Sequence, residues 1–137
     1  MDYILLNALP IFVATTMGLL AGQVFRTGTA RVGANRSVPR LNPGPRGFIA
    51  IALAEAWLAC ILAGALILAP SEAGAWTMAI GSAVVIWIGF VVPATVVNHI
   101  HRGLSAPVMA IDAVYWLVIM VVQAVALKTI GLVPPNG

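Results

Sequence analysis

Four long apolar runs, almost free of charge, constrain this chain more than any other feature of its sequence. Residues 3–25 and 73–101 contain no Asp, Glu, Lys or Arg, and residues 47–71 and 103–127 contain one acidic residue each. A membrane-spanning helix needs about 20 predominantly apolar residues, so each run is long enough to cross a bilayer. The sequence therefore predicts an all-α integral membrane protein, a single four-helix bundle with up-down topology over residues 1–137. The expected spans are 3–25, 47–69, 76–100 and 108–131.

Composition excludes most soluble classes of protein. The 137 residues are 61% hydrophobic and 8% charged, whereas a soluble domain carries about 25% charged residues. A soluble enzyme, a disordered segment and a nucleic-acid-binding domain are excluded on this ground. Cys60 is the single cysteine, so an intramolecular disulfide is impossible.

The basic residues are distributed unevenly along the chain. The loop expected at 26–46 holds five of the seven, and Arg102 follows the third span, while Lys128 lies toward the opposite end. An excess of Lys and Arg marks the cytoplasmic side of a membrane protein. We therefore expect the 26–46 loop inside and both termini on the periplasmic or exterior side. The five loop residues are Arg26, Arg31, Arg36, Arg40 and Arg46.

These arginines and Arg102 are also candidates for contact with lipid headgroups or a partner protein. Each cation near an anionic membrane surface adds about 1 kcal/mol of attraction. The alternative is that these arginines serve only to orient the protein in the membrane. The expected partners are the bilayer and its anionic lipids, and no nucleic acid is expected.

Small residues recur at steps of four in the first two spans, which places each set on one helix face. Small residues let membrane helices approach closely. We expect the two stripes to pack spans 1 and 2 together, with an oligomer contact as the alternative. The stripes are Ala14, Gly18 and Gly22 in span 1, and Ala52, Ala56, Cys60 and Gly64 in span 2.

Two acidic residues lie inside the expected spans. Glu55 is eight residues into span 2, about 12 Å from the cytoplasmic end, where it should face the bundle, find a partner or stay protonated. It is either a structural latch to another span or a proton or cation site. Asp112 lies early in span 4 on the same helix face as Tyr115, and its structural alternative is a bond from Arg102 or from the start of its own helix.

A proline interrupts the third span. Pro93 lacks an amide hydrogen, so the carbonyl of Gly89 loses its helical partner and a kink is expected. Asn98 follows toward the cytoplasmic end, so the kink, Glu55, Asn98 and Asp112 all fall in the expected cytoplasmic half. The candidate intramembrane polar site therefore combines Glu55, Asp112, Asn98, Tyr115, Gly89 and Pro93.

Spacing rules out the usual chemical motifs. His99 and His101 are two residues apart, which on a helix directs them away from each other, so we expect no metal site. No nucleophile elbow and no P-loop spacing occurs. Neither a cofactor nor enzymatic activity is expected.

Several short motifs stand out in the chain: Gly89-Phe90-x-x-Pro93, Asn98, Asp112-x-x-Tyr115-Trp116 and, more loosely, Phe25-Arg26-x-Gly28 and Arg31-x-Gly33. With these motifs the chain resembles DUF1761, a family of small bacterial four-span membrane proteins of unknown function. The resemblance implies four helices and a bacterial inner membrane but implies no activity. An aromatic-rich stretch of that family, at the end of span 1, is replaced here by Ala21-Gly22-Gln23.

Two functions are compatible with this sequence. The first is a non-enzymatic inner-membrane protein that acts as a homo-oligomer or as an accessory subunit of a larger membrane complex. The alternative is a small proton- or cation-coupled transporter or channel that uses Glu55 and Asp112. A dry bundle at Glu55 favours the first function, and a cavity that reaches Glu55 favours the second.

Overall fold

A computed structural model describes residues 2–29, 43–70 and 74–135. These residues form helices joined by short connections, with no strand among them, and the predicted all-α four-helix fold is confirmed. Four helical segments are long and apolar enough to cross a membrane, so the chain is a multi-pass membrane protein. They are Ala8–Thr29, Gly44–Leu68, Ala75–His101 and Ala106–Ile130.

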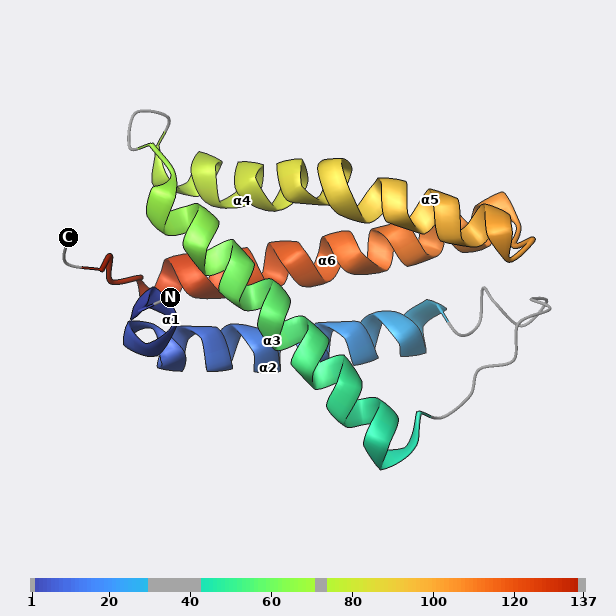
Figure 1. The fold of residues 1–137 in the computed structure, drawn as a ribbon, viewed down its shortest axis with the longest axis horizontal. Helices are drawn as coiled ribbons and strands as arrows, with labels where there is room; N and C mark the ends of the chain where they lie inside the picture. Colours follow the sequence, from blue (N-terminus) through green and yellow to red (C-terminus); the bar gives the residue numbers. More distant parts are fainter. Residues whose placement is uncertain (1, 30–42, 71–73, 136–137) are drawn as a thin grey trace.

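The segments carry the following labels in Figure 1. The first span is preceded by a short helix, α1, and the third is divided by a π-helical turn. The elements are α1 (Asp2–Leu6), α2 (Ala8–Thr29), α3 (Gly44–Leu68), α4 (Ala75–Ile86), η2 (Trp87–Val91), α5 (Val92–His101) and α6 (Ala106–Ile130).

The loop expected at 26–46 is shorter than the sequence indicates at both of its ends. Arg26 lies in the last turn of α2, which continues to Thr29, and Arg46 lies in the first turn of α3. Arg31, Arg36 and Arg40 fall outside the described residues.

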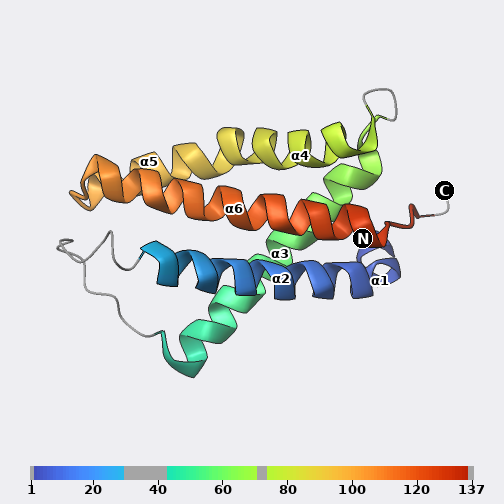
Figure 2. The ribbon, with the colours of Figure 1, turned by 180° about the vertical axis from the view of Figure 1, so that it is seen from behind.

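Three of the spans run side by side, and the other crosses them. In Figures 1 and 2, α2, α6 and the α4–α5 segment lie roughly parallel, while the N-terminal half of α3 diverges from the bundle. The N-terminus and the end of α6 share one end of the bundle, which we call the terminal end. The ends of α2 and α5 lie at the opposite end, which we call the basic end.

The apolar core occupies the half of the bundle near the terminal end. Its buried residues come from the first half of α2, the second half of α3, α4 and the second half of α6, and many are alanines that let the helices approach closely. Because α3 diverges beyond this point, the half near the basic end has room for cavities. The core includes Ile11, Ala14, Ala59, Leu62, Ala63, Met120, Ala124 and Leu127.

Asn7 separates α1 from α2, where the sequence predicts one span over 3–25. Its side chain is fully buried. The amide nitrogen donates to the carbonyls of Tyr3 and Val133, both at 2.8 Å, and the amide oxygen accepts from the N–H of Val133 at 2.7 Å. These bonds fasten the segment after α6 to the start of the chain.

The interruption expected at Pro93 takes the form of the π-helical turn η2. The N–H of Val92 donates to the carbonyl of Trp87, five residues earlier, and Pro93 enters α5 in its first turn, where its missing N–H is tolerated. The indole of Trp87 donates to the carbonyl of Ala113 in α6 at 2.7 Å. The turn is therefore tied to the neighbouring span.

Candidate functional site

Glu55 lies on the buried face of α3 with its carboxyl group sealed from solvent. The residue is 1% exposed, and within the described residues neither carboxyl oxygen has a hydrogen-bond partner. The side-chain amide of Gln123, on α6, donates to the backbone carbonyl of Glu55 at 3.1 Å. This hydrogen bond between α3 and α6 is thus accepted by the backbone carbonyl of Glu55, and the carboxyl group takes no part in it.

Gly18 provides the space in which these polar side chains lie. A Cβ atom at this position would stand 2.8 Å from both Glu55 Oε2 and Gln123 Nε2. Gly22, one turn further along α2, faces Tyr115 in the same way, with 2.9 Å between a Cβ and the phenol oxygen. The glycines of the span 1 stripe therefore accommodate polar side chains from α3 and α6.

The stripe expected in span 2 is displaced from the most buried face of α3. Ala52, Ala56 and Gly64 are only half-buried, whereas Ala59 and Ala63, on the neighbouring face, are fully buried. Gly64 contacts the ring of Tyr3 from α1, and the hydroxyl of Tyr3 donates to the carbonyl of Cys60 at 3.3 Å.

A cavity of about 190 Å³ lies between α2, α3 and α6. Its α3 lining begins at Gly44, in the first turn, and ends at Glu55, a distance of about 16 Å along the helix. Glu55 is therefore the innermost α3 residue of a cavity that starts at the basic end. The lining residues are Leu19, Gly22, Gln23, Arg26, Pro43, Gly44, Phe48, Ile51, Glu55 and Tyr115.

A larger cavity of about 610 Å³ lies on the other side of the diverging helix, against α5 and α6. It brings together three predicted site residues, Asn98, Asp112 and Tyr115, and adds polar groups that the prediction omitted. The full lining is Arg26, Ala50, Ile51, Ala54, Thr95, Asn98, His99, Arg102, Asp112, Tyr115 and Trp116.

Tyr115 and Arg26 line both cavities. The guanidinium carbon of Arg26 stands 5.3 Å from the centre of the Tyr115 ring, within the range of a cation–π contact. Phe25 and Trp116 meet the same ring edge-on, at centroid distances of 5.9 and 5.5 Å. Ile51 lines both cavities as well, so the Glu55 cavity and the larger one border the same three residues.

His99 is the partner of Asp112, in place of the partners that the sequence predicts. Its Nδ1 lies 2.9 Å from the carbonyl of Thr95, which can only accept, so Nδ1 carries a hydrogen. Its Nε2 lies 2.8 Å from Asp112 Oδ2. One proton therefore lies between the two groups, giving either an imidazolium and a carboxylate or a neutral imidazole and a carboxylic acid.

Other predicted residues lie away from these cavities. Gly89 and Pro93 are exposed and line neither of them, so the structure does not bring them to the polar site. Arg46 is exposed and also lines neither cavity. Across the described residues, no group of three His, Cys, Asp or Glu side chains is placed to hold a metal ion.

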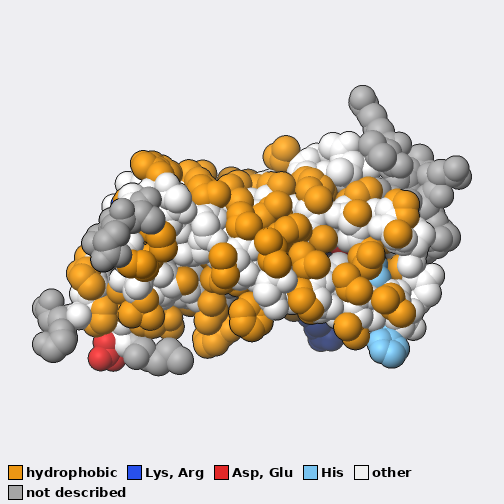
Figure 3. Space-filling view, turned by 90° about the horizontal axis from the view of Figure 1, so that it is seen from above, with side chains coloured by type: hydrophobic (Ala, Val, Ile, Leu, Met, Phe, Trp, Pro, Cys, Tyr) orange, Lys and Arg blue, Asp and Glu red, His pale blue; other side chains and the backbone are white. Residues whose placement is uncertain are grey.

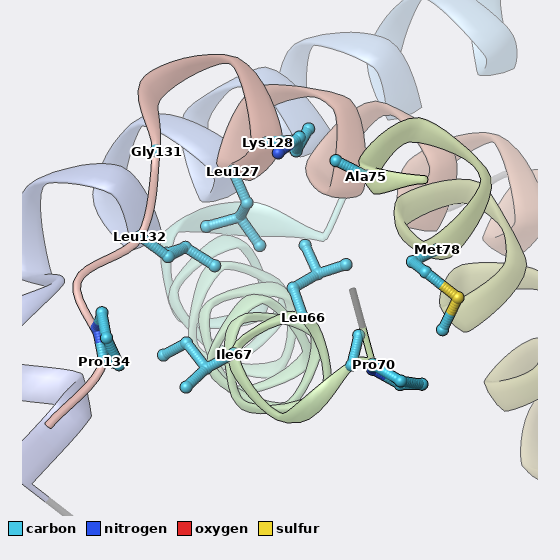
Figure 4. A pocket seen from close by; sticks show the side chains of 11 residues that line it. Leu66, Ile67, Pro70, Ala75, Met78, Leu127, Lys128, Gly131, Leu132 and Pro134 are labelled. Carbon is cyan, nitrogen blue, oxygen red and sulfur yellow. The ribbon is translucent and has the colours of Figure 1, made fainter. Parts of the chain in front are cut away.

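The two ends of the bundle differ in their chemistry. A cavity of about 300 Å³ at the terminal end is mostly apolar, and Figure 4 shows Leu66, Leu127 and Leu132 pointing toward one another across it. Lys128 is its charged lining residue. The face seen in Figure 3 is largely hydrophobic, and its Lys, Arg and His side chains gather toward the end where α5 finishes.

Comparison with known protein families identifies a match over most of the chain. The family described as "Protein of unknown function (DUF1761)" matches residues 9–128. No curated protein and no solved structure matches the chain.

Proposed function

The chain belongs to the DUF1761 family, whose description assigns no activity, and from its own residues we propose that it is a small transporter or channel that carries protons across the membrane. Glu55 is the residue that binds and releases the proton. The observation that carries this proposal is a buried carboxyl without a hydrogen-bond partner, at the inner end of a cavity from the basic end.

Burying the carboxyl of Glu55 without a partner costs free energy, and a functional role for this residue would explain why it is there. A polar group buried in an apolar surrounding without a hydrogen bond destabilises a protein by a few kcal/mol, and ionisable groups inside membrane spans mark ion or proton pathways. A latch would bond the carboxyl to another span. In the described residues it is the backbone of Glu55 that bonds to Gln123 instead.

Among the described residues, the surroundings of Glu55 favour a proton over a divalent metal cation. Divalent cations such as Ca²⁺ and Mg²⁺ take six or more oxygen ligands. Beside the carboxyl of Glu55, the side-chain oxygen that is also buried and unpartnered is Oε1 of Gln123. This donor set is too small for such a cation and sufficient for a proton.

The cavity lies on the basic-end side of Glu55, and the carboxyl itself is sealed from solvent. Toward the basic end the cavity reaches the first turn of α3, and toward the terminal end the core of Ala59, Leu62 and Leu127 is closed. Transport then requires a second conformation in which this core opens and the cavity closes. Tyr115 and Arg26, which line both cavities, are placed to close it.

We also propose that the protein lies in a bacterial inner membrane with the basic end in the cytoplasm. The asymmetry of Arg26, Arg46 and Arg102 against Lys128 supports this orientation. The Glu55 cavity then opens to the cytoplasm, and both termini face the exterior.

The experiment is proton flux across liposomes that contain the purified protein, followed with a pH-sensitive dye under an imposed pH gradient. Glu55→Gln keeps the size of the side chain but cannot ionise, so flux should fall to that of empty liposomes. Asp2→Asn, which alters an exposed acid in α1, is the matched control and should leave flux unchanged. Full flux in Glu55→Gln, or none in the unmodified protein, would contradict the proposal.

A second candidate function is that of a homo-oligomer or an accessory subunit. It is favoured by the divergence of α3, whose N-terminal half leaves the bundle (Figures 1 and 2) and carries exposed Phe48, Ile49, Leu53 and Trp57. Native mass spectrometry after release from mild detergent distinguishes the two roles. A stable complex that Leu53→Ala disrupts and Leu20→Ala on α2 does not would favour the second candidate.

A further inference from the structure

An apolar groove of about 400 Å³ continues from the larger cavity along the outer side of the bundle. The two share Ala54, Thr95, Asn98 and Trp116, so polar cavity and groove form one continuous site between α3 and the α5–α6 pair. The groove is open outward, because Trp57 and Phe90 on its walls are 58% and 74% exposed. Its other lining residues are Leu58, Ile61, Val91 and Ala94.

The polar part of this site carries net positive charge. Arg26 and Arg102 contribute one positive charge each. The pair of His99 and Asp112 is neutral overall in either arrangement of its shared proton, so it does not offset them. The side chain of Asn98 adds neutral hydrogen-bonding groups.

The polar cavity and the apolar groove lie at different depths in the membrane. Arg26 is in the last turn of α2, and Arg102 directly follows α5, so both stand where helices leave the membrane. Phe90 lies near the middle of its span, and Ile61 lies beyond the middle of α3, seven residues from its end at Leu68. A ligand that fits must therefore be anionic at headgroup depth and apolar further in, the order in which a lipid of one leaflet presents its parts.

We infer that this site binds one anionic phospholipid, with the phosphate near Arg26 and Arg102 and one acyl chain along the groove. Arginine is well suited to phosphate because its planar fork of donors matches the phosphate oxygens. Basic pockets between membrane helices bind phospholipid headgroups in this way. Arg26 also lines the cavity of Glu55, whereas Arg102 lines only this one.

Quenching of tryptophan fluorescence tests the inference, because Trp57 and Trp116 line the groove. The protein is placed in phosphatidylcholine nanodiscs that contain a minor amount of phosphatidylglycerol brominated on its acyl chains. Brominated phosphatidylcholine at the same amount gives the nonspecific quenching. We expect more quenching with phosphatidylglycerol, and no displacement by added inorganic phosphate, since the groove requires a chain.

Matched variants locate the binding. Removing one arginine contact worth about 1 kcal/mol weakens binding about fivefold, so Arg102→Gln should show this loss. Lys128→Gln, at the terminal end, should show none. Ala54→Phe, at the exposed position shared by cavity and groove, should reduce the specific quenching without removing a charge.

Several results would overturn the inference. Equal quenching by the two lipids would show that the site does not select an anion. An unchanged preference in Arg102→Gln, or an equal loss in Lys128→Gln, would place the binding elsewhere. Displacement by inorganic phosphate, or specific quenching by a brominated fatty acid alone, would assign the site to another anion.

Discussion

Replacing Glu55 with leucine tests whether the carboxyl helps to hold the bundle together. Leucine is of similar size and has no polar atom, and Gly18 leaves room for it. A buried polar group without a partner costs about 1–3 kcal/mol, and both carboxyl oxygens of Glu55 are in that position within the described residues. We therefore expect Glu55→Leu to raise the free energy of unfolding by about 1–3 kcal/mol.

The assay is unfolding in mixed detergent micelles with increasing sodium dodecyl sulfate, followed by circular dichroism. The matched control is Asn7→Leu, because the side chain of Asn7 is equally buried but makes three hydrogen bonds, whereas the carboxyl of Glu55 makes none within the described residues. It should lower the free energy of unfolding by about 1–3 kcal/mol, since the partner groups are left unpaired. A loss of stability in Glu55→Leu comparable with that of Asn7→Leu would refute the reasoning and identify the carboxyl as a structural latch. Greater stability together with lost proton flux is the trade-off expected of a functional site.

Two further predictions concern packing and topology. Gly22→Val should lower the free energy of unfolding by about 1–3 kcal/mol, because its Cβ would press on the phenol oxygen of Tyr115, whereas Gly28→Val, with open space around it, should have little effect in the same assay. Single cysteines at Ser37 and Asn136, in a cysteine-free background, should react differently with an impermeant reagent on intact cells: only position 136 should be labelled. Labelling at position 37 but not at position 136 would reverse the proposed orientation.

The fold could be predicted from the sequence because a bilayer leaves few choices. Apolar runs longer than 20 residues must satisfy their backbone groups internally, which helices do. The depth of Glu55 in its run also predicted that it would face the interior, and the structure buries it. Asp112 and Tyr115 were expected on one face of their helix, and Asn98 in the same half of the membrane as Asp112; all three line one cavity.

Partners across the bundle could not be predicted in the same way. Helical spacing shows which residues share a face of one helix but does not identify the helix that this face meets. Gly18 and Gly22 were expected to pack span 1 on span 2, yet they also receive Gln123 and Tyr115 from α6. The bonds of Asn7 to the segment after α6 join the two ends of the sequence, and no local pattern indicates them.

The proton shared by His99 and Asp112 leads to a last prediction. Nδ1 of His99 donates to the carbonyl of Thr95. Its Nε2 must therefore either accept a hydrogen from the carboxylic acid of Asp112 or carry a proton of its own and donate it to the carboxylate. An asparagine at position 112 can donate its amide hydrogen to a neutral Nε2, so Asp112→Asn should keep the bond and hold His99 as the neutral tautomer with hydrogen on Nδ1. Nitrogen NMR of labelled histidines in nanodiscs distinguishes these forms, with the exposed His101 as an internal reference. Because Asp112 is about half exposed, the lost ion pair should change stability by no more than about 1 kcal/mol. A His99 ring with hydrogen on Nε2 alone, in either protein, would contradict the hydrogen-bonding arrangement from which the shared proton is inferred.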